Sequence, residues 1–176
     1  MAEFGNVYMT DTDGNIGNAV AVPSDQVCGL LIDISGQGGD AFWTSGIGLE
    51  IAEHWKDTVV ELNSLDDAVK LGIKPYSSDA TDAGSNLIAG VPYYHVEQFF
   101  GIAGGRGRLF MMFADCTQNW NALTQMQRAA NGIISQIGIW TEQQCWSKAS
   151  SELTVYSNTM VADLNNAAKA LADDYF

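Results

Sequence analysis

Positive charge is scarce in this sequence. Eight Lys and Arg residues stand against 21 Asp and Glu residues, so the formal net charge is −13 at pH 7. A chain with this balance repels nucleic-acid phosphates and anionic membrane surfaces, and we expect no nucleic-acid partner.

Long apolar runs are also missing. None approaches the ~20 residues that a membrane-spanning helix needs, so we expect no membrane insertion. The first residues carry an early acid, Glu3, and lack the pattern of a signal peptide.

Cysteine and histidine are few as well, with three and two residues. Cys28, Cys116 and Cys145 lie far apart in apolar surroundings, which predicts reduced, mostly buried thiols of a protein made in the cytoplasm. Neither His54 nor His95 has a second ligand three or four residues away, so the pattern predicts buried or interface histidines and no metal site. A Cys–His nucleophile pair can still meet in space, and a Cys-dependent hydrolase therefore stays open as an alternative.

Carboxylates are plentiful but form no complete binding motif. Asp11 and Asp13 resemble the first half of a calcium-binding loop, yet the residue at the twelfth position, Val22, is not a glutamate. Asp79 and Asp82 lie in a polar loop, where solvated acids are expected. We therefore predict no catalytic residue, no metal ligand and no cofactor-binding residue. An Asp-dependent hydrolase stays beside the Cys-dependent one as the enzymatic alternative.

The chain has enough length and apolar content for one hydrophobic core. It has 176 residues, of which 47% are hydrophobic and 16% charged, a composition typical of a folded domain. Residues 1–18 are polar and punctuated by glycine, which predicts an extended arm. Residues 19–176 are predicted to form a single domain.

Strand and helix signals alternate through that domain. Short apolar runs predict buried strands at 26–34, 58–62, 108–114 and 133–140. Capping residues and helical spacing predict helices at 64–73, 86–103 and 119–132. They also predict a long closing helix that begins at Ser150 or Ser151 and carries Leu153 and Tyr156 on its apolar side. This alternation predicts an α/β fold, a layered sandwich in which helices flank a mixed, largely parallel sheet.

One segment looks like a ligand site: residues 101–108, which read "GIAGGRGR". A phosphate-binding glycine loop follows a strand and precedes a helix, whose N-terminal amides then face the anion. Here the predicted helix comes first and the strand last, so the loop lies at a helix C-terminus, where the partial negative charge repels phosphate. We interpret Gly104 and Gly105 as a left-handed pair that ends the helix, and Arg106 and Arg108 as cations beside it.

The order of these segments resembles the sheath proteins of contractile phage tails. Those proteins have a strand, a short helix led by a serine and an acid and closed by a glycine, a helix with two aromatic residues that ends in glycines, and then a strand. The later stretch "MQRAANGIISQIGIWTE" is similar to sheath-like sequences from gut Bacteroidetes phages and related contractile injection systems. The resemblance spans 59–176, and the corresponding residues here are Ser64, Asp67, Leu71, Gly72, Tyr94, Val96, Phe99, Phe100, Gly104 and Gly105.

The resemblance implies a mechanical role. Sheath subunits assemble as a homo-oligomer in helical rings around an inner tail tube protein. The extended array then contracts and drives the tube through a cell envelope. No nucleotide or other cofactor is implied, because the energy is stored as a difference in packing between two arrays. The implied location is the cytoplasm of the bacterial host during assembly, and then the virion tail or injection apparatus, with a prophage as one source of the gene. Residues 1–18 would be an arm that joins neighbours.

The chain also departs from this family. Sheath subunits are usually longer and continue into further strands, whereas this sequence ends at "ADDYF" after its last predicted helix. We therefore expect either a short member of the family or a fragment that is truncated at the C-terminus. The alternative within the same setting is another structural or adaptor protein of a phage, such as a tube or baseplate component.

Overall fold

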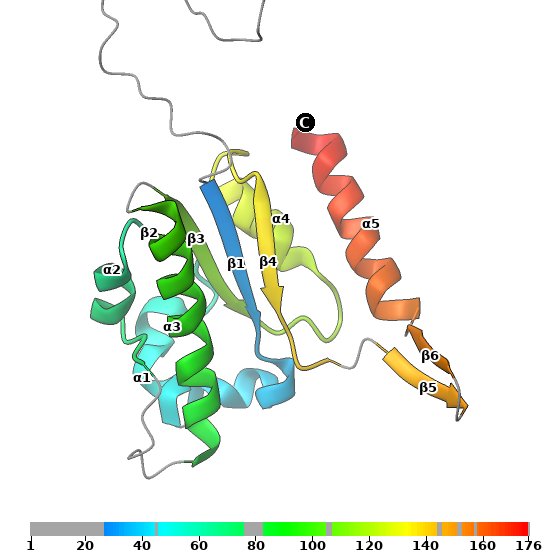
Figure 1. Ribbon diagram of the computed structural model, residues 1–176, viewed down its shortest axis with the longest axis horizontal. Helices are drawn as coiled ribbons and strands as arrows, with labels where there is room; N and C mark the ends of the chain where they lie inside the picture. Colours follow the sequence, from blue (N-terminus) through cyan, green and yellow to red (C-terminus); the bar gives the residue numbers. More distant parts are fainter. Residues whose placement is uncertain are drawn as a thin grey trace, which may run out of the picture.

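The computed structural model describes residues 27–44, 46–75, 83–104, 107–143, 146–150, 153–156 and 158–175. The predicted arm and the acids at 11, 13, 79 and 82 lie outside these residues. The described elements, most of them labelled in Figure 1, are strands β1 (Val27–Asp33), β2 (Val60–Leu62), β3 (Arg108–Ala114), β4 (Gln136–Trp140), β5 (Trp146–Ser150) and β6 (Leu153–Tyr156); 3-10 helices η2 (Ser35–Gln37) and η3 (Gly39–Thr44); and helices α1 (Gly46–Trp55), α2 (Leu65–Lys70), α3 (Ala83–Ala103), α4 (Asn121–Ala129) and α5 (Asn158–Tyr175).

Four strands form a mixed, mostly parallel sheet in the order β2-β3-β1-β4. β1 lies at the centre and pairs in parallel with β3 on one side and with β4 on the other. β2 pairs antiparallel with β3 at one end of the sheet. The predicted fold class is therefore confirmed, and the four predicted strands are all present, with β2 and β4 shorter than expected.

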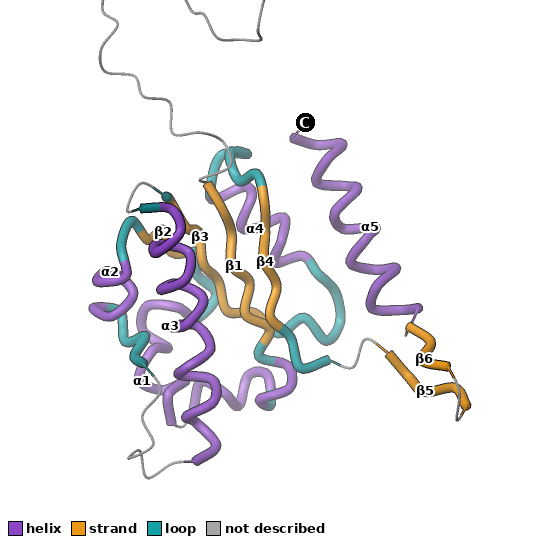
Figure 2. Tube along the Cα trace, viewed as in Figure 1, coloured by secondary structure: helices purple, strands orange, loops and turns teal. Residues whose placement is uncertain are grey.

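Helices cover both faces of this sheet, which makes it a three-layer sandwich. On one face, α1, α2, α3 and η3 pack on alternate residues of β1 and β3, including Ile32, Met111 and Phe113. On the opposite face, α4 and α5 pack on the intervening residues, among them Leu31 and Met112. Figure 2 shows these layers along the backbone trace. Because successive side chains of a strand point to opposite faces of the sheet, one run of apolar residues contributes to both cores.

The predicted short helix α2 is confirmed, together with its caps. The Ser64 hydroxyl accepts a hydrogen bond from the backbone N–H of Asp67 at 3.2 Å, and the Asp67 carboxylate accepts one from the N–H of Asn63 at 3.1 Å. Gly72 follows the helix with φ of 97°, a left-handed conformation that glycine adopts without strain. The sequence alone therefore determines where this helix begins and ends.

Replacing Ser64 with alanine is expected to lower the free energy of unfolding by about 1 kcal/mol, because the N–H of Asp67 loses its acceptor. Ser64→Thr is the matched control, since it keeps a hydroxyl oxygen at the cap. Urea denaturation of both variants measures the difference. An alanine variant as stable as the threonine variant would show that this hydrogen bond contributes nothing.

The predicted long closing helix is wrong in its first part. Residues 146–150 and 153–156 form a two-stranded antiparallel hairpin, and the helix begins only at Asn158. The run from Leu153 to Tyr156 contains Thr154 and Val155, whose branched side chains favour a strand once a partner strand is available. Helical spacing cannot reveal such a partner, so the sequence pattern extended the helix too far.

Within the part of the chain that the structure describes, no helix combines the length and the apolar character that a crossing of the bilayer demands.

Candidate functional site

The glycine segment joins a helix to a strand, as predicted. α3 ends at Ala103, Gly104 follows with φ of 61°, and β3 begins at Arg108. Gly105 and Arg106 lie outside the described residues. Gly107 is buried, and a side chain there would collide with the ring of Phe99. The described glycines therefore serve chain reversal and close packing.

Arg108 has a different partner from the one the sequence predicts. Its guanidinium donates a hydrogen bond to the Glu61 carboxylate at 2.8 Å and lies 5.5 Å from the centre of the Phe110 ring. The hydrogen bond to Glu61 raises the pKa of Arg108 above its ordinary value. Arg108 thus links β3 to β2 across the sheet, and it is not a cation that only balances the end of α3.

The described histidines and cysteines lie on four different segments of the fold. His54 is exposed in the last turn of α1, and half-buried His95 on α3 has the ring of Tyr94 edge-on to it. Cys28 is half-buried in β1, whereas Cys116 is buried after β3. Burial, and then the nearby carboxylates of Asp33 and Asp115, raise the pKa of the Cys116 thiol to about 12. A nucleophilic cysteine needs the opposite shift. Cys145 lies outside the described residues.

Cys116 is therefore expected to resist alkylation by iodoacetamide at neutral pH in the folded protein and to react once urea unfolds the chain. The physical reason is that the thiol stays protonated and buried, so little thiolate is available. Mass spectrometry of the peptide that contains Cys116 measures the modified fraction. Alkylation of the folded protein as fast as that of the unfolded chain would contradict the assignment of a buried, neutral thiol.

The loops that follow β1 and β3 lead to opposite faces of the sheet. These neighbouring parallel strands end at the same edge of the sheet. The chain leaves β1 toward η3 and α1 on one face, and it leaves β3 toward α4 on the opposite face. In open α/β sheets, ligands bind in crevices outside the carboxyl ends of the strands.

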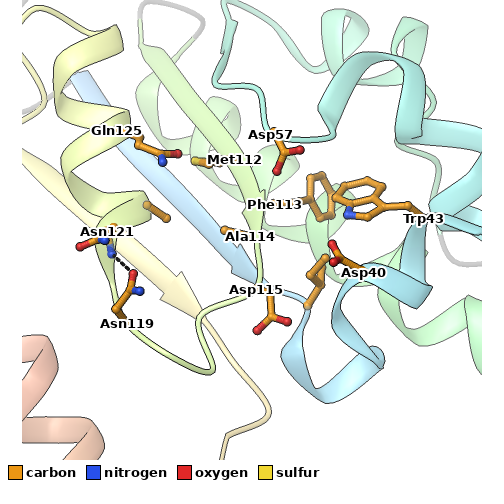
Figure 3. A pocket seen from close by; sticks show the side chains of 12 residues that line it. Asp40, Trp43, Asp57, Met112, Phe113, Ala114, Asp115, Asn119, Asn121 and Gln125 are labelled. Atoms are coloured by element: carbon orange, nitrogen blue, oxygen red, sulfur yellow. Dashed lines mark hydrogen bonds between the residues drawn. The ribbon is translucent and has the colours of Figure 1, made fainter.

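A crevice of about 270 Å³ occupies this place (Figure 3). Its floor is formed by the ends of β1 and β3, and its rim by η3, the loop after α1 and the start of α4. Carboxylates and amides surround an aromatic wall that Trp43 and Phe113 form. The polar residues that line it are Asp40, Asp57, Asp115, Asn119, Asn121 and Gln125.

Beside this crevice, Asp33 holds the ends of the three parallel strands together. Its buried carboxylate accepts hydrogen bonds from the loop after its own strand β1, from the loop after β3 and from the loop after β4. The donors are the N–H and hydroxyl of Ser35 at 3.0 and 2.9 Å, the N–H of Cys116 at 3.0 Å, the hydroxyl of Thr141 at 2.6 Å and the side-chain amide of Gln143 at 2.7 Å. Asp33 therefore acts as a structural clamp at this edge.

The hydrogen bonds to Asp33 keep its carboxyl group ionised. Burial would raise the pKa of the Asp33 carboxyl, but the donors from Thr141, Ser35, Cys116 and Gln143 outweigh it and hold that pKa below its ordinary value. The carboxylate is thus ionised at neutral pH and fully engaged. Because its oxygens are occupied, Asp33 orients the loops around the crevice, while the carboxylates of Asp40, Asp57 and Asp115 are the ones that reach it.

Sequence reasoning did not identify this site. Asp33 and Asp115 come directly at or after buried strands, in "LIDIS" and "MFADC", and that position was the available signal. The order of strands, which brings the two ends together, could not be known from the chain alone. Within the described ranges, no group of three or more His, Cys, Asp or Glu side chains is arranged to hold a metal ion.

The protein is therefore a mixed α/β domain with a crevice at the carboxyl ends of β1 and β3 and a buried aspartate that braces this edge of the sheet. Comparisons with protein-family models, with curated proteins and with solved structures find no match to this chain.

Proposed function

We propose that this chain is a structural subunit of a contractile tail sheath, which assembles helically around an inner tube and contracts to drive it through a cell envelope. The supporting observation is the run of elements β2-α2-α3-β3. It has the order that the resemblance implies: strand, capped short helix, longer helix and strand.

Several of the residues that carry the resemblance have scaffold roles in the structure. Ser64 and Gly72 bound α2. Val96 and Phe100 of α3 are buried against the sheet, and Gly104 ends that helix in a left-handed conformation. A subunit that transmits force needs such rigidly connected elements, and the Asp33 clamp adds a further connection at the opposite edge of the sheet.

Negative-stain electron microscopy of the full chain, expressed with and without its cognate inner tube protein, tests the proposal. Hollow striated cylinders around the tube, or wider and shorter ones that form alone, are the expected result. Small discrete particles in both preparations would contradict a sheath. Particles that bind only the end of the tube would instead favour an adaptor or baseplate component.

The location of the crevice favours one second candidate, an Asp-dependent hydrolase, because ligands of open α/β sheets bind outside the carboxyl ends of the strands. The test compares the hydrolysis of a panel of chromogenic esters by the wild-type chain, by Asp115→Asn and by Asp173→Asn, which changes an exposed carboxylate on α5. An activity lost only in Asp115→Asn would support the enzyme. A chain that forms cylinders and leaves every ester intact would reject it.

A further inference from the structure

The wall of the crevice contains a buried hydrogen-bond donor. Trp43 of η3 lines the crevice and is only 7% exposed, yet its indole N–H donates to none of the residues that the structure describes. The indole N–H of the fully buried Trp55, in contrast, donates to the carbonyl oxygen of Leu71 at 3.0 Å. In Figure 3, the nitrogen of Trp43 is on the side of the ring that faces Asp40. Because an unpaired buried N–H is costly, its place in this wall points to a ligand that supplies an acceptor.

The carboxylates of the crevice have the opposite need. Asp40 and Asp57 are exposed and accept no hydrogen bond from any described side chain or backbone group. Asp115 has a fixed orientation, because the N–H and the hydroxyl of Thr117 both donate to its Oδ1 atom, at 2.9 and 2.5 Å. Among the described residues that line the crevice, none is a lysine, an arginine or a histidine. The crevice therefore repels anions and offers acceptors to the donors of a ligand.

Amide side chains form the wall opposite Trp43. Figure 3 shows Asn119, Asn121 and Gln125 at the start of α4, across the crevice from η3. The backbone N–H of Asn121 donates to the Oδ1 atom of Asn119 at 3.0 Å, which leaves the amide nitrogen of Asn119 as a donor. A primary amide both donates and accepts hydrogen bonds. This wall can therefore bind groups that do the same.

The combination of groups selects one chemical class of ligand. A bare metal ion does not fit, because the carboxylates of the described chain do not converge in a group that could hold one. A metal ion or an ammonium group would also leave the Trp43 N–H without an acceptor. A hydroxyl group, in contrast, donates to a carboxylate and accepts from an N–H. At about 270 Å³, the crevice is near the lower limit of the ~300–1,000 Å³ of ligand sites, so the ligand must be small.

We propose that this crevice binds a small, neutral ligand with several hydroxyl groups, of the size of one saccharide ring. One hydroxyl oxygen accepts the N–H of Trp43, other hydroxyls donate to Asp40 and Asp115, and the amides on α4 bind the far side of the ring. Binding of this ligand requires neither assembly into a sheath nor hydrolysis of a bond.

NMR of the full-length chain tests the proposal. The indole N–H groups of the five tryptophans give separate signals, and the signal lost in Trp43→Phe identifies Trp43. D-glucose, D-galactose and D-mannose are titrated to about 50 mM, because a small ligand with few anchoring groups is expected to bind with a dissociation constant on the order of 1 mM. We expect at least one of the three hexoses to shift the Trp43 signal. The uronic acid of the same sugar should bind at least about tenfold more weakly, because the carboxylates repel it.

Two pairs of variants relate the binding to its residues. Trp43→Phe keeps the aromatic wall but removes the donor, and we expect binding about tenfold weaker, followed by the amide signals of α4. Trp55→Phe is its matched control, since it removes an indole N–H outside the crevice and should bind as the wild type does. Asp40→Ala should also weaken binding about tenfold, whereas Asp173→Ala on the exposed side of α5 should not.

The proposal is overturned if none of the three hexoses shifts the Trp43 signal. Binding of the corresponding 2-amino sugars without binding of the neutral hexoses would assign the crevice to cations and would also overturn it. Equal binding by Trp43→Phe and Trp55→Phe would place the sugar elsewhere on the protein. Because electron microscopy of the cylinders and the ester assay are separate measurements, failure of this proposal is distinguishable from failure of the sheath or of the hydrolase.

Discussion

A Trp55→Ala variant is expected to lose about 4–5 kcal/mol of its free energy of unfolding, the upper end of the range for a buried tryptophan. Trp55 ends α1 with no exposed surface, and its ring meets that of Phe113 edge-on, at 5.5 Å between centroids. Its indole N–H also donates to the carbonyl oxygen of Leu71 at 3.0 Å. Truncation therefore opens a cavity between the sheet and the helices, and it leaves the carbonyl oxygen of Leu71 without its donor.

Trp55→Phe separates these two effects. It keeps an aromatic ring against Phe113 but removes the donor, so we expect a smaller loss of about 1–2 kcal/mol. Urea denaturation measures the free energy of unfolding of both variants, and the slope of that free energy against urea concentration should equal the slope of the wild type. Because domains of this kind are stable by only about 5–15 kcal/mol, the alanine variant should also show a clearly lower melting temperature. A loss below about 2 kcal/mol for Trp55→Ala would contradict a close-packed core at this position.

An Asp33→Asn variant is expected to lose about 3 kcal/mol, because hydrogen bonds to a buried charged group are strong and their donors are left facing an amide. The substitution keeps the size of the side chain while it removes the charge. Loops after β1, β3 and β4 lose their common acceptor together. Asp40→Asn is the matched control, since the Asp40 side chain is exposed and its change is expected to have little effect.

The same pair of variants predicts a difference in acid sensitivity. The folded pKa of Asp33 is below its ordinary value of 3.8. Its stabilising contribution is therefore present above that ordinary value and is lost as the pH falls below it, through the folded pKa. The wild type and Asp40→Asn should lose stability in this acid range more steeply than Asp33→Asn does. Parallel curves for wild type and Asp33→Asn would show that folding does not lower the pKa of Asp33.

Local patterns predicted much of the fold. β3 occupies the predicted residues 108–114, because seven consecutive residues of that apolar run pair with a neighbour on the central strand. α2 begins after Ser64 and ends before Gly72, where the capping groups are neighbours in the chain. The hairpin β5-β6 was missed because it depends on a partner strand. The spacing of Leu153 and Tyr156 fits a helix, but these residues pair instead with the strand that starts at Trp146.

The candidate site could not be predicted in the same way. Asp33 binds Cys116 across 83 positions and Gln143 across 110 positions of the chain. No local pattern relates residues so far apart, and the crevice exists only because the chain leaves β1 and β3 toward opposite faces.

The sequence by itself determined the α/β class, the positions of the main strands and the caps of α2, because each depends on groups within a few residues of one another. Only the tertiary structure decided the strand order, the pairing of Arg108 with Glu61 and the clamp at Asp33. These features depend on which strands become neighbours, and that choice follows from burial of both faces of the sheet by helices distant in the chain.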